Sequence, residues 1–210
     1  MTLYQPSHFA VGDRATLVTL MRERPLATLV SVAESEPSFT HLPLEVEEHD
    51  RGIRLLGHVA RANPHWKQWT DGAAVTAVFH GPDGYVSPAW YAAREAVPTW
   101  NYIVVHAHGR VAVTHDSAAK EQILKALIDR HDPAYRQQWD DLGDEYRERM
   151  KGAIVGLTIE VERLEGKFKL GQNRPLADRR RVLAELDAAD DARGRALAAW
   201  IRRLGAAAED

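Results

Sequence analysis

The 210-residue sequence predicts a mainly β fold with helices (α+β), in the form of a small β-barrel with helical additions. Short runs rich in β-branched and aromatic residues are separated by Gly and Pro turns, which is typical of such barrels. A helical apolar pattern interrupts these runs near the middle of the chain, and the last forty residues have the Ala, Leu and Arg content of helices. Hydrophobic residues make up 45% of the chain, enough for a substantial core.

The N-terminal part predicts one helix followed by three strands. Asp13 can cap a helix over residues 15–23, which Pro25 ends and which places Leu17, Leu20 and Met21 on one face. Strands are expected at residues 26–32, 39–46 and 53–58. Pro43 assigns the second of them to a sheet edge or a bulge, because proline cannot donate to the ladder.

The middle of the chain predicts further strands. Asn63 and Pro64 start a short helical turn that carries two tryptophans. Residues 73–79 are almost continuously apolar, which predicts a strand buried on both faces and followed by a turn at 81–84. A long strand is expected over residues 100–113.

The C-terminal half is predicted to be largely helical, with one strand. Asp116 can cap an amphipathic helix over residues 117–131, whose apolar face contains Ile123, Leu127 and Ile128. The remaining expected elements are a polar helix at 140–150, a strand at 154–164, and two terminal helices at 176–186 and 192–204.

Composition and charge exclude several classes of protein. A net charge of −3 argues against strong, sequence-independent binding to nucleic acid, which usually leaves a basic domain. Because the chain has no cysteine, disulfides and thiolate chemistry are impossible. There is neither a secretory signal pattern nor an apolar run approaching the roughly 20 residues that cross a bilayer. We therefore expect a soluble, cytoplasmic protein.

Common catalytic and metal-binding signatures are missing from the sequence. His106 and His108 share one face of a predicted strand, but a metal would need further ligands there, so hydrogen-bonded histidines and no metal are expected. The Gly-rich nucleotide-binding motifs, a nucleophile elbow and a paired-carboxylate signature are all absent.

Four runs of one chemical type stand out, each with aromatic residues beside amide or cationic ones: 58–66, 84–91, 97–102 and 169–174. Aromatic faces, amides and guanidinium groups suit a planar, phosphate-bearing cofactor. Taken singly, each run also has a purely structural interpretation, as a helix start with core tryptophans, a hairpin, a strand start or a solvated connection. Only a fold or a dimer could bring them together.

Read together and in order, these runs resemble the PaiB family, the FMN-binding negative transcriptional regulators. The resemblance extends from Tyr4 to about Leu204 and is most specific at Val97–Tyr102 and at Gln172–Arg174. The other matching pieces are Thr40–Leu44, Gly57-His58, Ala62–Pro64, Tyr85–Ser87, Trp90-Tyr91, Val105-His106, Gly152–Gly156 and Phe168–Leu170.

This resemblance implies an FMN-binding split β-barrel with C-terminal helices, the fold of pyridoxamine-phosphate-oxidase-like flavoproteins. It also implies a homodimer with flavin sites at the subunit interface. We expect residues 1–170 to form the FMN-binding domain, with inserted helices at about 116–150. Residues 171–210 would add a helical extension to the same structural unit.

The resemblance also points to individual cofactor-binding residues. Arg61 and Asn63 are expected at the flavin phosphate, with Arg174 as a second phosphate-binding guanidinium. Trp100 and Asn101 would flank the ring, and residues 169–174 would arrive from the partner subunit or the barrel mouth. The full set of candidates is Thr40, His41, Leu42, His58, Arg61, Ala62, Asn63, Trp100, Asn101, Lys169, Gln172, Asn173 and Arg174.

Two classes of function follow from a bound FMN. The first is a dimeric transcriptional regulator, for which the slightly acidic charge gives little support for direct DNA contact. The second is a flavin-dependent oxidoreductase or flavin reductase acting on an unnamed small substrate.

Overall fold

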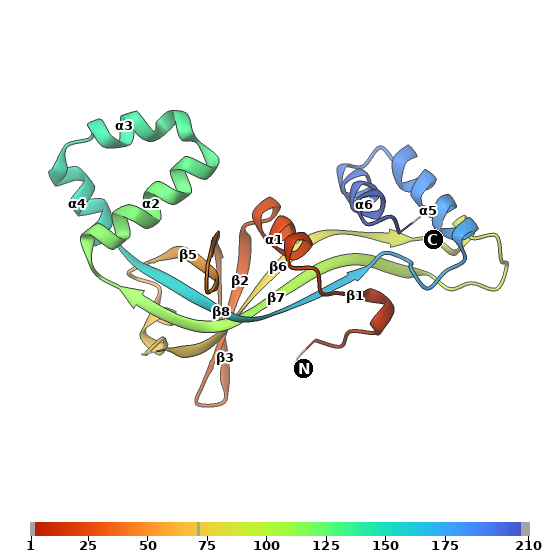
Figure 1. Ribbon diagram of the computed structural model, residues 1–210, viewed down its shortest axis with the longest axis horizontal. Helices are drawn as coiled ribbons and strands as arrows, with labels where there is room; N and C mark the ends of the chain where they lie inside the picture. The colour runs from red at the N-terminus through yellow and green to blue at the C-terminus, as the bar shows by residue number, and fades with distance from the viewer. Residues whose placement is uncertain (1–2, 71, 207–210) are drawn as a thin grey trace. The chain divides into compact units, whose positions relative to one another are not determined.

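The computed structural model describes residues 3–70 and 72–206 (Figure 1). Its elements follow in this order: η1 (Ser7–Phe9), β1 (Ala10–Val11), α1 (Arg14–Glu23), β2 (Leu26–Ala33), β3 (Glu36–Pro43), β4 (Glu45–His49), β5 (Gly52–Ala60), η2 (Pro64–Gln68), β6 (Ala73–Val86), η3 (Pro88–Trp90), β7 (Thr99–Thr114), α2 (Ser117–His131), η4 (Pro133–Tyr135), α3 (Arg136–Asp141), α4 (Asp144–Gly152), β8 (Ile154–Lys169), α5 (Leu176–Ala188) and α6 (Ala192–Arg203), where η marks 3-10 helices.

The described strands form one eight-stranded sheet. Their order is β3-β2-β6-β7-β8-β5-β4, and β1 pairs with β8. The pairs β1–β8, β2–β3, β2–β6, β4–β5 and β5–β8 are antiparallel. The expected mainly β fold with helices is therefore confirmed. Within the described parts of the chain, no helix is long and apolar enough to cross a membrane.

The chain divides into two compact units. The first unit consists of Met1–Leu17, His80–Val105 and Glu165–Asp210, and the second of Val18–Phe79 and His106–Leu164. Each unit holds part of the set of residues that the sequence predicts for cofactor binding.

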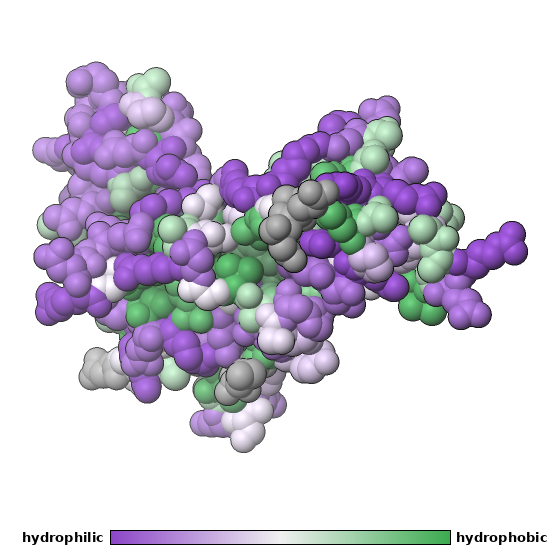
Figure 2. Space-filling view, turned by 45° about the vertical axis from the view of Figure 1, so that its right-hand side comes forward, coloured by the Kyte–Doolittle hydropathy of each residue, from purple (hydrophilic) through white to green (hydrophobic). Residues whose placement is uncertain are grey.

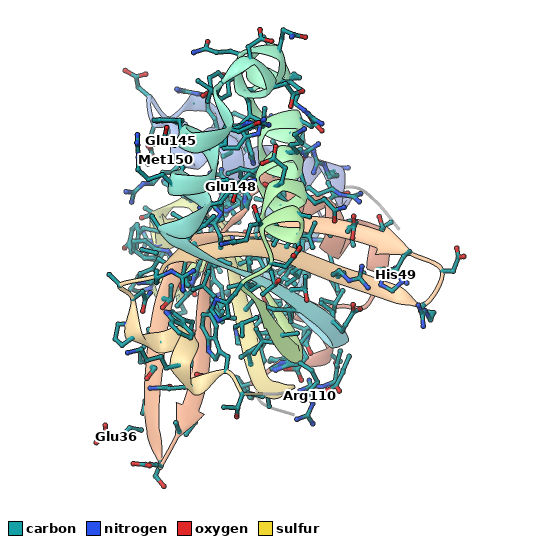
Figure 3. All side chains as sticks on the ribbon, turned by 90° about the vertical axis from the view of Figure 1, so that its left-hand side faces the viewer. Glu36, His49, Arg110, Glu145, Glu148 and Met150 are labelled. Atoms are coloured by element: carbon teal, nitrogen blue, oxygen red, sulfur yellow. The ribbon has the colours of Figure 1, made fainter. Side chains whose placement is uncertain are left out.

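Helix α1 begins where the sequence predicts it, and the β2–β3 hairpin follows. Asp13 accepts hydrogen bonds from the backbone N–H and the hydroxyl of Thr16, at 2.9 and 2.6 Å. In the hairpin, Glu34 and Ser35 adopt positive φ values of 51° and 69°, as a tight turn requires. Glu36 lies next to this turn (Figure 3).

The C-terminal boundary of the strand predicted over residues 39–46 is wrong. The chain leaves β3 after Pro43, and the N–H of Leu44 donates to the carbonyl oxygen of Pro25 at 2.9 Å instead of continuing a ladder. A separate strand, β4, then pairs with β5 through a hairpin whose end carries His49 (Figure 3). The edge position inferred from Pro43 is confirmed, because β3 is the first strand in the order.

Strand β6 differs from the prediction in two ways. Only one of its faces is fully buried, through Val75, Ala77 and Phe79, so it is not covered on both sides. The strand also runs on through the expected turn at residues 81–84. There, Asp83 accepts a hydrogen bond from the indole of Trp100 on β7, and Tyr85 contacts the same ring, so cross-strand contacts outweigh the local turn signal.

The helices between β7 and β8 differ from the single polar helix predicted at residues 140–150. Asp116 caps α2 as predicted, by accepting from the N–H of Ala119 at 2.7 Å. The polar helix expected at 140–150 is instead two helices, α3 and α4, which break at Gly143. Buried Trp139 anchors α3 by donating to Glu121 on α2, a contact that the local pattern could not show. The helical segment is mostly hydrophilic on the face seen in Figure 2.

In the first unit, β8 extends to Lys169, five residues beyond the predicted end at 164. Its last part pairs with the short strand β1, which the sequence did not reveal. Both terminal helices, α5 and α6, form as predicted. Phe168 at the end of β8 packs edge-on against Trp200 of α6, with ring centroids 5.5 Å apart, and this contact belongs to the core of the unit.

Candidate functional site

The predicted cofactor-binding residues form two groups. The second unit holds the first group, at the ends of β3 and β5 and in the loop after β5: Thr40, His41, Leu42, His58, Arg61, Ala62 and Asn63. The first unit holds the second group, at the start of β7 and in the turn between β8 and α5: Trp100, Asn101, Lys169, Gln172, Asn173 and Arg174.

Arg61 is anchored at the C-terminal end of α4. Its Nε donates to the carbonyl oxygen of Gly152 at 2.6 Å, and its Nη2 donates to that of Ile154 at 3.3 Å. The backbone N–H of Arg61 donates to the carbonyl oxygen of Ala153 at 2.8 Å. The hydrogen bonds on one edge of the guanidinium therefore stabilise the fold. The outer edge, Nη1 and the second hydrogen of Nη2, points away from these bonds on an exposed side chain and can meet an anion.

A second cation reinforces this helix end. Buried Lys120 donates from Nζ to the carbonyl oxygen of Lys151 at 2.7 Å. Burial first, and then the positive charge of Arg61, lower the pKa of Lys120. Carbonyl groups at a helix C-terminus favour cations, so Arg61 and Lys120 both complement α4. Together they concentrate positive charge beside the loop after β5.

Asn63 and Thr40 belong to a buried hydrogen-bond chain centred on His65. The Oδ1 of Asn63 caps η2 by accepting from the N–H of His65 at 3.0 Å, and its Nδ2 donates to the hydroxyl of Thr40 at 3.1 Å. That hydroxyl lies 2.8 Å from Nδ1 of His65, and Nε2 lies 2.7 Å from the hydroxyl of Ser31. Thr40, Ser31 and His65 are all buried, so the chain joins β2, β3 and η2.

The donors and acceptors assign one tautomer to His65. The Ser31 hydroxyl donates its one proton to Oε1 of Gln68 at 3.5 Å and so accepts from Nε2–H of His65, which leaves Nδ1 to accept from the Thr40 hydroxyl. Burial lowers the pKa of His65, which agrees with a neutral ring. Sequence reasoning missed His65, because a histidine after Asn63-Pro64 carries no local signal of its distant partners.

The other members of the first group face different directions. Thr40 and Leu42 alternate with His41 along β3, so His41 projects from the opposite, exposed face and contacts Thr28 at 3.0 Å. His58 is half-buried on β5, and burial lowers its pKa. Ala62 is exposed beside Arg61. The structure thus brings Arg61, Ala62, Asn63 and Thr40 together, but not His41.

In the second group, Lys169 and Gln172 use their side chains for hydrogen bonds at the end of β8 and in the turn that follows. Lys169 donates from Nζ to the hydroxyl of Thr99 at 2.5 Å and to the carbonyl oxygen of Trp100 at 2.9 Å. Gln172 uses both ends of its amide, accepting from the N–H of Leu170 at 2.8 Å and donating to the carbonyl of Phe168 at 2.6 Å. These bonds fix the turn, and Asn173 is exposed on it.

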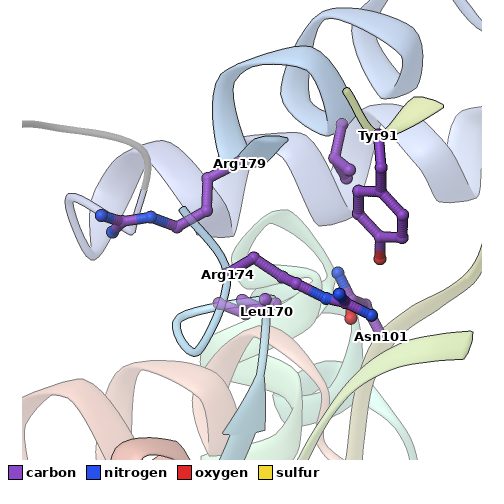
Figure 4. Close-up of a pocket in the computed structure, with 7 residues that line it drawn as sticks. Tyr91, Asn101, Leu170, Arg174 and Arg179 are labelled. Carbon is purple, nitrogen blue, oxygen red and sulfur yellow. The ribbon is translucent and has the colours of Figure 1, made fainter. Parts of the chain in front are cut away.

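Trp100 and Asn101 occupy opposite faces of β7. Trp100 is half exposed and donates to Asp83 at 2.8 Å, whereas Asn101 is buried. Gly171, in the turn, has a φ of +86°, which favours glycine. Asn101, Arg174 and Tyr91 line a pocket in this unit (Figure 4), and Arg174 was predicted without its partner Tyr91.

Known proteins resemble this chain in both sequence and fold. The family model "Putative FMN-binding domain" matches residues 3–163. The chain is 32% identical over 187 residues to protease synthase and sporulation protein PAI 2 of Bacillus subtilis, covering 88% of this chain and 89% of that protein. It is 27% identical over 246 residues to an uncharacterized protein of Emericella nidulans, covering 97% and 98%.

Two solved structures resemble the fold. The FAD and heme binding protein from Mycobacterium smegmatis has a TM-score of 0.60 at 20% identity, covering 77% of this chain and 73% of that one. The flavocytochrome from Azotobacter vinelandii also has a TM-score of 0.60 at 20% identity, covering 76% and 69%. The predicted fold class, an α+β split β-barrel with C-terminal helices, is confirmed.

Proposed function

We propose that this chain, which belongs to the PaiB family of FMN-binding proteins, is a cytoplasmic homodimer that uses its FMN in negative regulation of transcription. FMN is the cofactor of the family domain that residues 3–163 match. Dimerisation, regulation and the cytoplasmic location are the proposed part. They rest on the resemblance to the family's negative transcriptional regulators, which the 32% identity to the sporulation protein PAI 2 across most of both chains supports.

The loop after β5 fits the flavin phosphate. Arg61 offers the outer edge of its guanidinium on an exposed side chain, and two of its other N–H groups are already fixed on Gly152 and Ile154. A guanidinium held in this way loses little freedom when it binds an anion. Lys120 adds positive charge nearby. We therefore propose that Arg61, Ala62 and Asn63 contact the phosphate.

The remaining candidates receive different roles. Thr40 and Leu42 support the loop from the buried face of β3, and His58 is proposed to meet the polar rim of the flavin. His41, on the opposite face of β3, is left out of this site. We propose that the partner subunit supplies the second group, with Trp100, Asn101, Lys169, Gln172, Asn173 and Arg174 near the ring. When bound, FMN supplies hydride or single-electron transfer.

Replacing Arg61 with alanine is expected to weaken FMN binding about ten- to a hundredfold. A charge-assisted hydrogen bond contributes roughly 1.5–3 kcal/mol, and this substitution removes both the positive charge and the paired N–H donors of the guanidinium. Affinity is measured by quenching of FMN fluorescence. Arg51→Ala, at an exposed arginine in the turn before β5, is the matched control and should bind FMN as the wild type does. Equal affinities for the two variants would remove Arg61 from the phosphate site.

The proposal is tested on the FMN-loaded protein with three measurements: a gel shift, sedimentation and flavin absorbance. We expect specific retention of operator DNA from its own gene neighbourhood in a gel shift at physiological salt, with a dimer in sedimentation. We also expect slow flavin reduction by NADH or NADPH, followed by absorbance. Rapid reduction and turnover without DNA retention would instead identify a flavin-dependent oxidoreductase, and a monomer at micromolar concentration with FMN bound would contradict the dimer.

A further inference from the structure

Lys167 lies near the end of β8 in the first unit, on the face of the strand opposite to α6. The next residue along the strand, Phe168, packs against Trp200 of α6, and successive side chains of a strand point to opposite faces. Figure 1 shows α5 and α6 on the upper side of this part of β8 and the N-terminal segment before η1 on its lower side. The surroundings of Lys167 come from this N-terminal segment and from the neighbouring strand β7.

Two tyrosine rings hold the ammonium group of Lys167. Its Nζ lies 5.0 Å from the ring centroid of Tyr4 and 5.3 Å from that of Tyr102 on β7, distances at which the face of an aromatic ring attracts a cation. Tyr4 is 82% exposed, and its neighbour Gln5 donates from its side chain to the carbonyl oxygen of Gly166. The N-terminal segment is thus anchored to β8 next to Tyr4, and the pairing of β1 with β8 extends this anchor.

The ammonium group has no acid as its partner. Lys167 is 7% exposed, yet it forms no hydrogen bond or ion pair with any residue among 3–70 and 72–206. Glu165, on the same face and roughly 7 Å away along the strand, is not its ion-pair partner. Lys169, also on this face, uses its Nζ for the hydroxyl of Thr99 and the carbonyl oxygen of Trp100. Because lysines are rarely buried without a partner, the three N–H donors of Lys167 indicate a ligand that accepts hydrogen bonds.

A ligand can reach this ammonium group from the surface. The aliphatic stem of Lys167 is buried, whereas its Nζ keeps contact with solvent. Tyr4 borders the Nζ as an exposed side chain, and Tyr102 is half-buried. The ligand therefore binds on an open surface beside the two rings and needs no closed cavity. Water screens an ion pair at such a lysine less than it screens a pair between two fully exposed side chains.

We propose that Lys167 binds the carboxylate of a small aromatic acid. One unpaired positive charge matches a monoanion, and the carboxylate of Glu165 on the same face disfavours a doubly charged anion such as phosphate. The rings of Tyr4 and Tyr102 then pack edge-on or offset against the ring of the acid, which favours a flat ring over an aliphatic one. Neither tyrosine nor Lys167 is a candidate for FMN binding, so this site goes beyond the proposed function and does not depend on it.

The test is a titration of the FMN-loaded full chain with benzoate, followed by calorimetry and saturation-transfer NMR. Benzamide has the same shape without the negative charge, and it should bind at least about tenfold more weakly. Cyclohexanecarboxylate keeps the charge but lacks the flat ring, and it should bind about two- to tenfold more weakly. Inorganic phosphate should also bind more weakly than benzoate.

Variants of the chain separate loss of the ligand from loss of the fold. Lys167→Met keeps an apolar stem without the charge, so benzoate affinity should fall at least about tenfold while the urea midpoint is retained or raised. Tyr4→Ala, at an exposed position, should weaken benzoate binding about two- to tenfold. Lys67→Met is the matched control, because Lys67 also lies over a ring, with its Nζ 6.0 Å from the centroid of Trp66, but is exposed. This control should bind benzoate as the wild type does.

Three results would overturn the proposal. The first is that benzamide or phosphate binds as tightly as benzoate, and the second is that Lys167→Met binds benzoate normally. The third is that benzoate binds only the FMN-free chain, which would make Lys167 part of the flavin site. Because the FMN-free chain is titrated in parallel, failure to bind FMN is distinguishable from failure to bind the acid.

Discussion

Replacing His65 with leucine is expected to lower the free energy of unfolding by about 3 kcal/mol and to weaken FMN binding. The ring joins the hydroxyls of Thr40 and Ser31 at 2.8 and 2.7 Å, and all three residues are buried. Leucine leaves both hydroxyls without that partner, and a stranded buried group costs about 1–3 kcal/mol. Urea unfolding and FMN fluorescence quenching measure the two effects.

The controls for His65 separate the hydrogen bonds from the change in shape. His65→Gln keeps one hydrogen bond and should fall between wild type and leucine. In the double variant Ser31→Ala with His65→Leu, one of the two stranded hydroxyls is gone, so the loss should be smaller than the sum of the singles. His80→Leu, on an exposed position of β6, should change stability by about 0.5 kcal/mol or less. Additive singles would show that the chain of bonds does not act as a unit.

A methyl group at Gly109 is expected to destabilise the protein by about 3 kcal/mol. Gly109 lies on β7 in the second unit, and a Cβ there would overlap the carbonyl oxygen of Glu160 on β8, whose carbonyl carbon is 3.0 Å away. The obstacle is backbone, which cannot rotate away as a side chain can, so the strands must separate. Equilibrium urea unfolding of Gly109→Ala measures the loss.

This separation would also reach the candidate flavin site. Strand β8 pairs with β5 so that Ala60 lies opposite Ile154, and this register brings Arg61 to the carbonyls of Gly152 and Ile154. Gly109→Ala should therefore weaken FMN binding as well as stability. Gly152→Ala is the control, since nothing lies within 4 Å of its added methyl, and it should be as stable as wild type or slightly more so. A Gly109→Ala protein with the wild-type midpoint would contradict the close approach of the strands.

The sequence predicted those elements whose signals are local. Asp13 and Asp116 cap α1 and α2 as expected, because a cap depends only on the next three residues. The wrong predictions fall where contacts between residues far apart in the sequence determine the local structure. Leu44 turns away to Pro25, the turn expected at 81–84 is held straight by Trp100, and Trp139 anchors a helix that no periodicity revealed.

For the candidate site, the sequence predicted the types of residue involved but not the hydrogen bonds that these residues make. The resemblance selected Arg61 and Gln172, but only the structure shows that one edge of Arg61 serves α4 and that Gln172 closes its own turn. Alternation along β3 and β7 likewise separates His41 from Thr40 and Trp100 from Asn101. His65 was missed because its partners lie 34 and 25 residues away.

The central claim is that the chain binds FMN through its phosphate at the loop after β5. Titration of the full chain with FMN and with riboflavin, which lacks the phosphate, tests it most directly by fluorescence quenching. We predict that the wild type binds FMN at least about tenfold more tightly than riboflavin, and that Arg61→Ala abolishes most of this preference. Equal affinity for the two flavins in the wild type, or a preference for FMN that survives in Arg61→Ala, would contradict the account.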